Sequence, residues 1–410
     1  MKIPVRTRLT PGLYSGKPIK WLGTIAHQAF PVFPAFRCHC LRRASYDRLY
    51  PQNGRRTKKW LDDASFRDGV ALCQMVPGAT AMQASCYVGL KLRGVSGAAV
   101  SFIGFGLPSF LIMTALSALY MQFRDLPIVI SAFSGLQAII VSIVANAAIT
   151  FGRVTIRNWQ AAFIAIASGI LFGFEINPLL VILLAASAGI LLYLKQPTPP
   201  FASSGMSYTT YRPVLFIIAV FTTAFIILFF IDRNLFNLAA LMVRIDLFAF
   251  GGGFASVPFM FHEVVNVNHW MDGKTFLDGI ALGQITPGPI VITATFIGYL
   301  LYGFAGATIA TLSIFLPSFL IVVGVAPYFD KLRALSYFNK AVSGVLSSFV
   351  GLLLSVTILF AINIPWDIWH VLLAIAAFVA LFFKVEIYWV VMAGVLISIP
   401  LFLNVTTVIE

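Results

Sequence analysis

The chain has 410 residues, of which 59% are hydrophobic and only 10% charged, and its mean hydropathy is +0.91. A soluble domain carries about a quarter charged residues, so this composition excludes a water-soluble globular protein. The net charge of +13 comes almost wholly from residues 1–60, which hold thirteen of the 28 Lys and Arg residues and a single acid, Asp47.

Residues 1–59 form an irregular basic segment with scattered prolines and glycines and without a clean membrane span. Positive clusters of this kind favour the cytoplasmic face of a membrane, so we expect a lipid surface and not nucleic acid beside them. The start of the chain lacks the apolar core of a cleavable signal peptide, and none is expected.

The rest of the chain contains apolar runs of the roughly 18–20 residues that cross a hydrocarbon core. They predict an all-α polytopic membrane protein, because a β-barrel would show short segments of alternating polarity instead. The expected spans lie at about 96–121, 127–151, 159–175, 176–194, 213–231, 234–261, 304–327, 336–361, 366–383 and 386–404, and broken elements lie at 60–90 and 274–302.

A polar stretch rich in proline and serine, residues 195–212, separates two halves of the chain. We therefore predict a first transporter repeat at 60–194, a linker and bridging span at 195–233, and a second transporter repeat at 234–410.

The two halves carry the same motifs at a fixed spacing. Trp60 recurs as Trp270, and the sequence QMVPG at 74–78 recurs as QITPG at 284–288, both 210 residues later. The motif LPSFL at 107–111 returns at 316–320, after 209 residues. These coincidences of Gly, Pro and Gln indicate a tandem duplication.

Seven expected crossings precede the second broken element when the first broken element is counted, which predicts repeats of inverted orientation. The basic run before the first copy and the neutral-to-acidic stretch before the second agree with this prediction. A re-entrant broken element is the alternative. It would make the number of crossings even, and the two repeats would then have the same orientation.

Each Pro-Gly break has the chemistry of an anion site. A proline inside a helix removes one N–H and frees a carbonyl, so the chain is expected to unwind and start a new helix. The N-terminus of that helix offers unpaired N–H donors and a partial positive charge. The candidate substrate-binding residues are Gln74, Pro77, Gly78, Thr80, Gln284, Thr286, Pro287, Gly288, Thr293 and the glycines Gly251, Gly252 and Gly253.

Gly and Pro also serve helix packing and kinks in membranes, which is the alternative for a single Pro-Gly. The duplication of the whole Gln-x-x-Pro-Gly motif favours function over packing. The LPSFL motif, with Pro108 and Pro317, is interpreted as a kink.

Charged residues at membrane depth form a second set of candidates. Arg244 is a candidate counter-charge for a substrate anion, and Asp68, Asp246 and Asp278 are candidates for ion coupling. Snorkelling or a helix-end position is the alternative for Asp246, and helix capping is the alternative for Asp68 and Asp278. Arg244 and Asp246 are poor partners for each other, because residues two apart point to different faces of a helix.

No enzyme is expected, since the sequence has no phosphate-binding Gly-rich loop, no Ser/His/Asp order and no metal-ligand spacing. We expect no cofactor and no metal. Cys38-His39-Cys40 is too tight and isolated for a zinc site, and Cys73 and Cys86 are expected to pack as small hydrophobic residues.

Several motifs resemble the chromate ion transporter family. They are LCQMVPGATAMQ, YVGLKLRGVSGA and LPSFL in the first half, and FAFGGGFASVPFM, FLDGIALGQITPGP and LPSFL in the second. The resemblance covers about 60–404 and implies a two-domain member with halves of opposite orientation. It further implies chromate efflux across the inner cell membrane, driven by the proton-motive force, with sulfate as a related anion.

The resemblance leaves alternatives open. A carrier of sulfate or another oxyanion fits the same residues, and so does an inactive transporter remnant. The partners expected are a small oxyanion, protons and the bilayer, and a homodimer is allowed for.

One departure from the family pattern concerns the start of the chain. The family opens each half with a helix that ends in Phe-Gly-Gly, which occurs here only as Phe250-Gly251-Gly252. Our hypothesis is that residues 1–54 are degenerate or out of frame, and a Phe-Gly-Gly-like stretch in a neighbouring reading frame of the gene would support it.

Overall fold

A computed structural model describes residues 63–194 and 212–406, and in these ranges the chain is helical without any strand. The prediction of an all-α protein is confirmed. The basic segment 1–59, with Cys38-His39-Cys40 and the proposed degenerate start, lies outside the described residues, as does most of the linker.

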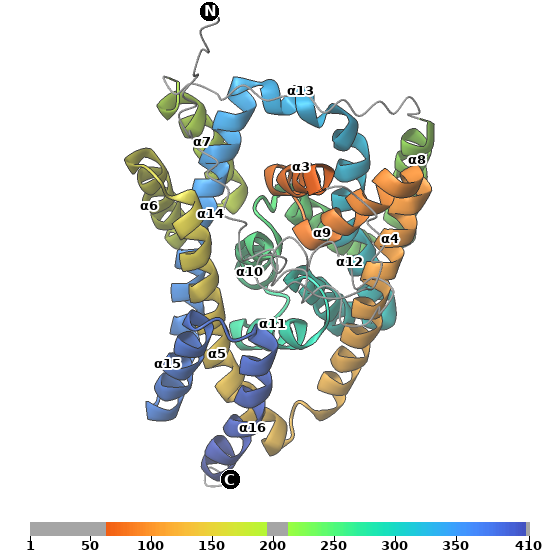
Figure 1. The fold of residues 1–410 in the computed structure, drawn as a ribbon. Helices are drawn as coiled ribbons and strands as arrows, with labels where there is room; N and C mark the ends of the chain where they lie inside the picture. Colours follow the sequence, from red (N-terminus) through yellow and green to blue (C-terminus); the bar gives the residue numbers. More distant parts are fainter. Residues whose placement is uncertain (1–62, 195–211, 407–410) are drawn as a thin grey trace, which may run out of the picture.

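Five helices form the first repeat (Figure 1). Their bounds are α3 Asp63–Met75, α4 Thr80–Phe123, α5 Pro127–Thr155, α6 Trp159–Gly173 and α7 Pro178–Leu192.

The second repeat has the same series, and the elements that precede it are described as well. After α8 (Arg212–Ile231) come α9 Arg233–Phe248, η1 Gly253–Ala255, α10 Ser256–Phe261 and the π-helical turn η2 His262–Val267. The remaining elements are α11 Gly273–Ile285, η3 Ile290–Ile292, α12 Thr293–Val325, η4 Ala326–Tyr328, α13 Phe329–Ala334, α14 Ser336–Ile362, α15 Ile368–Phe382 and α16 Ile387–Thr406. By motif spacing, α11, α12, α14, α15 and α16 match α3, α4, α5, α6 and α7.

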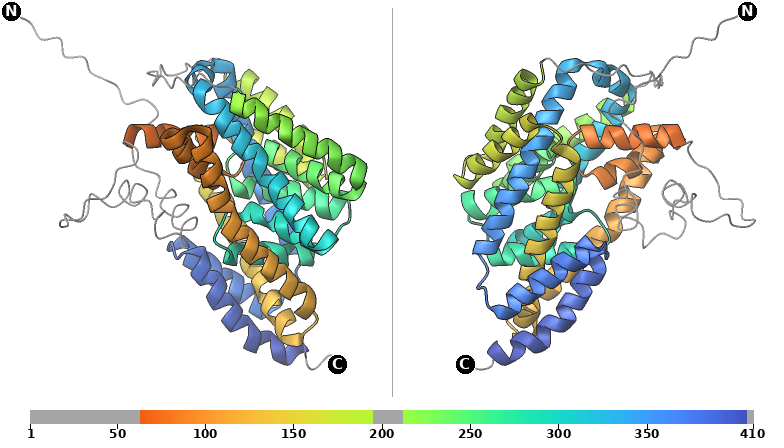
Figure 2. Two further views of the ribbon diagram at one scale, coloured as in Figure 1. Left: turned by 90° about the vertical axis from the view of Figure 1, so that its right-hand side faces the viewer. Right: turned by 60° about the vertical axis from the view of Figure 1, so that its left-hand side comes forward.

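The two repeats run in opposite directions. In Figure 1, α4 descends to the turn before α5 at the bottom, whereas α12 rises to α13 at the top. The matching helices α5 and α14 are likewise opposed, and the side views in Figure 2 agree. The inverted orientation expected from the sequence is therefore present in the fold.

Both α4 and α12 are sharply folded at a glycine. The kinks lie at Arg93-Gly94 and at Tyr302-Gly303, where the glycines have φ of +64° and +57°. Gly89 meets the backbone of Gly97, and Gly298 meets that of Gly306. Eight residues span about 12 Å of straight helix, so these contacts require the chain to fold back at the kink.

Several expected spans are shorter than a full crossing. Helices α6, α7 and α15 have 15 residues each, or about 22 Å, whereas the hydrocarbon core is about 30 Å thick. Helices α6 and α7 form one short hairpin and α15 and α16 another, with matching left-handed turn residues Glu175 and Lys384. Such a hairpin returns to the side of the membrane from which it enters. It therefore does not change whether the number of crossings between the two repeats is odd or even.

Four described helical segments are long and apolar enough to cross a membrane by length and composition. They are Thr80–Phe123, Pro127–Thr155, Ile290–Tyr328 and Ser336–Ile362. The expected single span at 234–261 is wrong, because the chain leaves the helix after Phe248 and passes through Gly251 and Gly252 with φ of +91° and +108°. Glycine adopts these angles without the steric cost that other residues bear.

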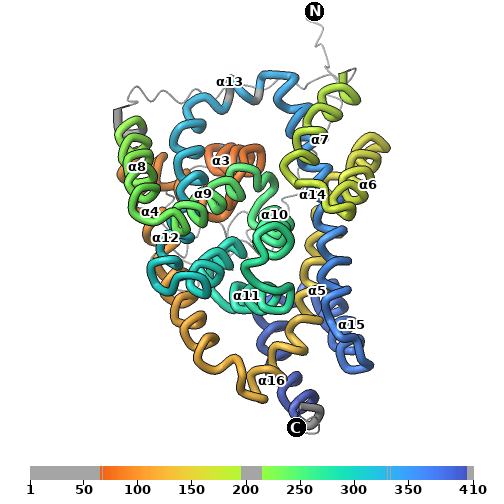
Figure 3. The backbone as a smooth tube through the Cα atoms, turned by 180° about the vertical axis from the view of Figure 1, so that it is seen from behind, coloured from red at the N-terminus to blue at the C-terminus, as the bar shows by residue number. Residues whose placement is uncertain are grey.

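Each repeat packs its short hairpin onto the other repeat. Helices α6 and α7 lie against α14, and α15 and α16 lie against α5 (Figure 3). Glycines allow this contact: Gly351 meets the carbonyl of Ala165, Gly344 meets Ala185 and Gly189, and Gly135 meets Ser398. Close backbone approach through small residues is the usual way in which membrane helices associate.

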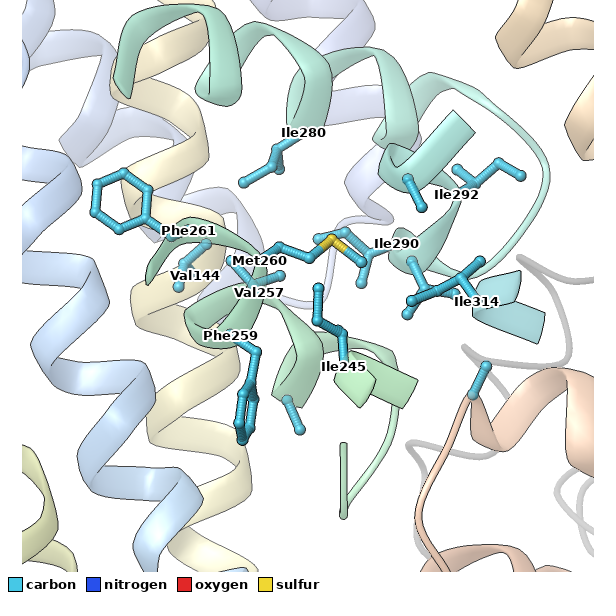
Figure 4. Close-up of a cluster of buried hydrophobic side chains, with 14 of the residues drawn as sticks. Val144, Ile245, Val257, Phe259, Met260, Phe261, Ile280, Ile290, Ile292 and Ile314 are labelled. Atoms are coloured by element: carbon cyan, nitrogen blue, oxygen red, sulfur yellow. The ribbon is translucent and has the colours of Figure 1, made fainter. Parts of the chain in front are cut away.

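The centre of the molecule is filled by the short helix α10 and its neighbours. Val257, Phe259, Met260 and Phe261 of α10 are all buried, and they are surrounded by Ile245, Ile280 and Ile290 among others (Figure 4). Cys73 and Cys86 are also fully buried, as expected for small hydrophobic residues. This packed centre fixes the elements that carry the two breaks.

The hairpin contact predicts an effect of Gly351→Ala. A methyl group there would collide with the Ala165 carbonyl and the Gly169 backbone, so we expect a loss of about 1–3 kcal/mol in the free energy of unfolding. The measurement is thermal unfolding of the purified protein in detergent. Gly104→Ala in α4, where nothing lies within 4 Å, is the matched control and should not destabilise. Equal unfolding temperatures for the two variants would contradict the prediction.

Candidate anion site between the helix breaks

The first break, Val76–Ala79, is held by the second repeat. The Gly78 N–H donates to the Ala249 carbonyl at 2.9 Å, and the Ala79 N–H donates to Ser318 Oγ at 2.8 Å. Within the first repeat, Gln83 Nε2 donates to the Pro77 carbonyl at 2.5 Å. The groups that a proline break frees are therefore paired mostly across the repeat boundary.

The second break, Thr286–Pro289, is held by the first repeat. The Ser109 hydroxyl donates to the Pro287 carbonyl, and a Cβ on Gly288 would collide with the same hydroxyl. Ser109 and Ser318 are the matching serines of the two LPSFL motifs. Each motif thus supports the break of the opposite repeat.

The glycine loop Gly251–Gly253 lies between the two breaks and touches both. A Cβ on Gly252 would lie 3.0 Å from Thr80 Oγ1 at the first break. A Cβ on Gly253 would lie 3.1 Å from Ile290 Cγ2 and 3.7 Å from Pro289 Cβ at the second. This loop brings three of the sequence-predicted segments together at one place.

The helices that follow the breaks, α4 and η3, begin without a side-chain cap from their own N-cap residues, Ala79 and Pro289. The first N–H groups of such a helix have no partner within it and carry its positive end. Gln284 adds a buried Nε2 that has no hydrogen-bond partner among the described residues. The arrangement suits an anion with several oxygen acceptors.

Asp246 lies directly behind the first break. Its side chain is fully buried, and its Oδ2 accepts hydrogen bonds from Ser318 N at 2.8 Å and Ser318 Oγ at 2.7 Å. Its Oδ1 has no partner within the described part of the chain. A titratable group is thus connected through one serine to the helix start at Ala79.

Two of the candidate threonines do not offer a proton to a ligand. Thr286 Oγ1 donates to the Gly283 carbonyl and Thr293 Oγ1 to the Ile290 carbonyl, each at 2.8 Å. A threonine has one hydroxyl proton, so in this conformation neither side chain has a proton free for a ligand, and their place in the candidate site stays a prediction. Backbone N–H groups and the Gln284 amide remain as donors.

Three candidates lie away from the breaks. Arg244 forms an ion pair with Glu263 at 2.6 Å and is half exposed, so its charge is already matched. Asp278 accepts from Tyr120 Oη and Gln137 Nε2, both at 2.8 Å. Asp68 is half-buried in α3. The candidate Gln74, by contrast, is half-buried at the end of α3, next to the first break.

The residues that the sequence interpretation missed are Ser109 and Ser318. The LPSFL motif was expected to supply only a kink, because its prolines dominate the local geometry. The signal was the repetition of the serine itself after 209 residues, since a kink needs no hydroxyl.

Comparison with known proteins gives a consistent result. The family model described as chromate transporter matches residues 52–190 and again 236–399. The chain is 44% identical over 349 residues to an uncharacterized transporter of Methanocaldococcus jannaschii, covering 83% of this chain and 86% of that protein. It is 33% identical over 346 residues to a chromate transport protein of Cupriavidus metallidurans, covering 80% of each. A chromate transport protein of Pseudomonas aeruginosa is 28% identical over 317 residues, with 73% of this chain and 72% of that protein covered. No solved structure matches the chain.

The geometry of the first break predicts that Gly78→Ala destabilises the protein more than Gly94→Ala does. Both glycines have positive φ, which costs an alanine about 1–3 kcal/mol. Only Gly78 is crowded, by Ser318 Oγ and Gln83 Nε2, whereas nothing lies within 4 Å of a Cβ on Gly94. Thermal unfolding of the two variants in detergent compares them directly, and equal losses would show that the break is not packed against α12.

Proposed function

The chain belongs to the chromate transporter family, and on that premise we propose that it is a secondary transporter that exports chromate through the paired helix breaks. The observation that carries the proposal is the contact of the Gly251–Gly253 loop with both breaks. Two uncapped helix starts from oppositely oriented repeats then face one anion, which is how inverted-repeat transporters place a substrate.

The proposed site binds by backbone N–H groups, which match the oxygens of a tetrahedral dianion without a fixed positive side chain. Gln74, Gln284 and Thr80 would add polar contacts beside the breaks. Arg244 is proposed as an approach residue and not as a direct ligand, because Glu263 already pairs with it.

We assign proton coupling first to Asp246. It is buried behind the helix start at Ala79 and has one oxygen without a partner among the described residues. A like unit charge about 5 Å away costs roughly 3 kcal/mol at an effective dielectric constant of about 20, so a protonated Asp246 favours the bound dianion. Asp68 and Asp278 stand second, since Asp278 is satisfied by two neutral donors.

The direction of transport follows from charge. A chromate dianion that travels with one proton carries a net charge of minus one. Moving one such charge out of a negative cell releases about 2.3 kcal/mol per 100 mV, so the electrical part of the proton-motive force drives export.

Vesicles that contain the purified protein test the proposal. A potassium diffusion potential that makes the inside negative should accelerate the release of labelled chromate, and excess sulfate should compete if the site reads only shape and charge. Vesicles without protein are the control. Equal release from both kinds of vesicle would refute transport, and release that ignores the potential would refute the coupling.

The unpaired amide of Gln284 gives a second prediction. A hydrogen bond to a charged group contributes about 1.5–3 kcal/mol, so Gln284→Leu should raise the KM for chromate by about tenfold or more. Gln122→Leu, at an exposed position near the end of α4, is the matched control and should leave KM unchanged. Unchanged KM in Gln284→Leu would remove this side chain from the site.

A further inference from the structure

The serines of the two LPSFL motifs are placed alike but connected differently. Ser318 lies against Gly78 and Ala79 of the first break, and Ser109 lies against Pro287 and Gly288 of the second. Both contacts cross from one repeat to the other. By position the two serines are equivalent, and the difference between them lies in their hydrogen-bond partners.

The preceding proline explains how each serine can serve the other repeat. Pro108 and Pro317 lack an N–H and disturb the helix at this point. In the second repeat, the Ser318 N–H donates to Asp246 Oδ2 at 2.8 Å. The motif therefore turns polar groups of a membrane helix outward.

The hydrogen bonds of Ser318 form a continuous path. Its Oγ accepts the N–H of Ala79 at 2.8 Å and donates its proton to Asp246 Oδ2 at 2.7 Å. Asp246 thus bonds through a single hydroxyl to the helix start of the first break. Removing the negative charge from Asp246 weakens the pull on that proton, because hydrogen bonds to ionised groups are the stronger ones.

Ser109 has a different partner. Its hydroxyl donates to the Pro287 carbonyl and lies 3.5 Å from the Phe105 carbonyl. Both partners are backbone groups that do not titrate. Among the described residues, the second break therefore has no carboxylate connected to it through its serine.

Few charged groups of the described residues lie around Asp246. Helices α10 and α12 carry no charged residue, and Arg212 begins α8. Arg244, two residues earlier on α9, is paired with Glu263 of η2, and His262 precedes Glu263. Arg244 and Glu263 neutralise each other, so the local charge depends mainly on whether the Asp246 carboxyl group is protonated.

We propose that Ser318 is a positioning residue that transmits the protonation of Asp246 to the first break, while Ser109 is a fixed support of the second. When Asp246 is ionised, the Ser318 proton is held by the carboxylate and the Ala79 N–H is held by Ser318. When Asp246 takes up a proton, the Ser318 hydroxyl is free to turn toward an anion at Gly78. One proton is gained by Asp246 and none is lost by Ser318. This inference rests on the proposed function. It means that, of the two breaks, only the first responds to protonation of a carboxylate.

Hydrogen exchange of the purified full chain tests the path without any transport. The protection of amides at 76–82, corrected for the intrinsic rate, should change between about pH 5 and about pH 8 in the wild type. The change should persist in Ser109→Ala and be lost in both Ser318→Ala and Asp246→Asn. The amides at 286–292 should show no such change in any of these proteins. A pH-dependent change that survives in Ser318→Ala, or that appears equally at both breaks, would overturn the proposal.

Chromate flux supplies a second and separate readout. We expect Ser109→Ala to lower flux by a similar factor, up to about tenfold, at every pH. Ser318→Ala and Asp246→Asn should each remove most of the pH dependence, and the double variant should show no further loss. A merely structural serine would lower flux without changing its pH profile. Absence of flux in the wild type would refute the proposed function, while the exchange experiment would still decide the role of Ser318.

Discussion

Every buried backbone N–H and C=O in a membrane needs a partner, and a helix broken by proline cannot supply its own. Here the partners come from the opposite repeat: Ala249 and Ser318 for the first break, and Ser109 for the second. This exchange ties the two breaks to each other and places the glycine loop between them. The positive helix ends are consequently assembled by both halves of the chain, so the proposed site needs both of them.

Duplication supplies two similar halves, but the environment of each half makes them different. Asp246 stands beside Ser318, whereas the hydrogen-bond partners of the Ser109 hydroxyl within the described ranges are backbone carbonyls. A second difference lies at α11, where Asp278 is bonded by Tyr120 and Gln137. At the matching distance of 209 residues, these two positions hold Phe329 and Leu346 in the second half. The inverted fold is thus close to symmetric in its helices and asymmetric in its buried polar groups.

The sequence was sufficient for the features that repeat or that depend on hydrophobicity. The helical membrane fold, the duplication, its inversion and both Pro-Gly breaks follow from apolar runs and from Gly, Pro and Gln spacing. The sequence was insufficient to predict contacts between segments that are distant along the chain. The pairing of Arg244 with Glu263, the hydroxyl bonds of Thr286 and Thr293, and the role of Ser318 depend on contacts that no local pattern encodes. The short hairpin α6–α7 was also hidden, because its two helices are as apolar as full spans.

The packing of each repeat's hairpin onto the other repeat has a consequence for the synthesis and folding of this protein. Helix α5 is synthesised well before the helices that cover its Gly135 face, α15 and α16. Until then the first half stands in the bilayer with its packing face turned to lipid or to a chaperone. Contacts between such distant segments are slow to form. The first repeat therefore completes its packing only after α15 and α16 have been made, and loss of these two helices would leave the first repeat unfinished as well as the second.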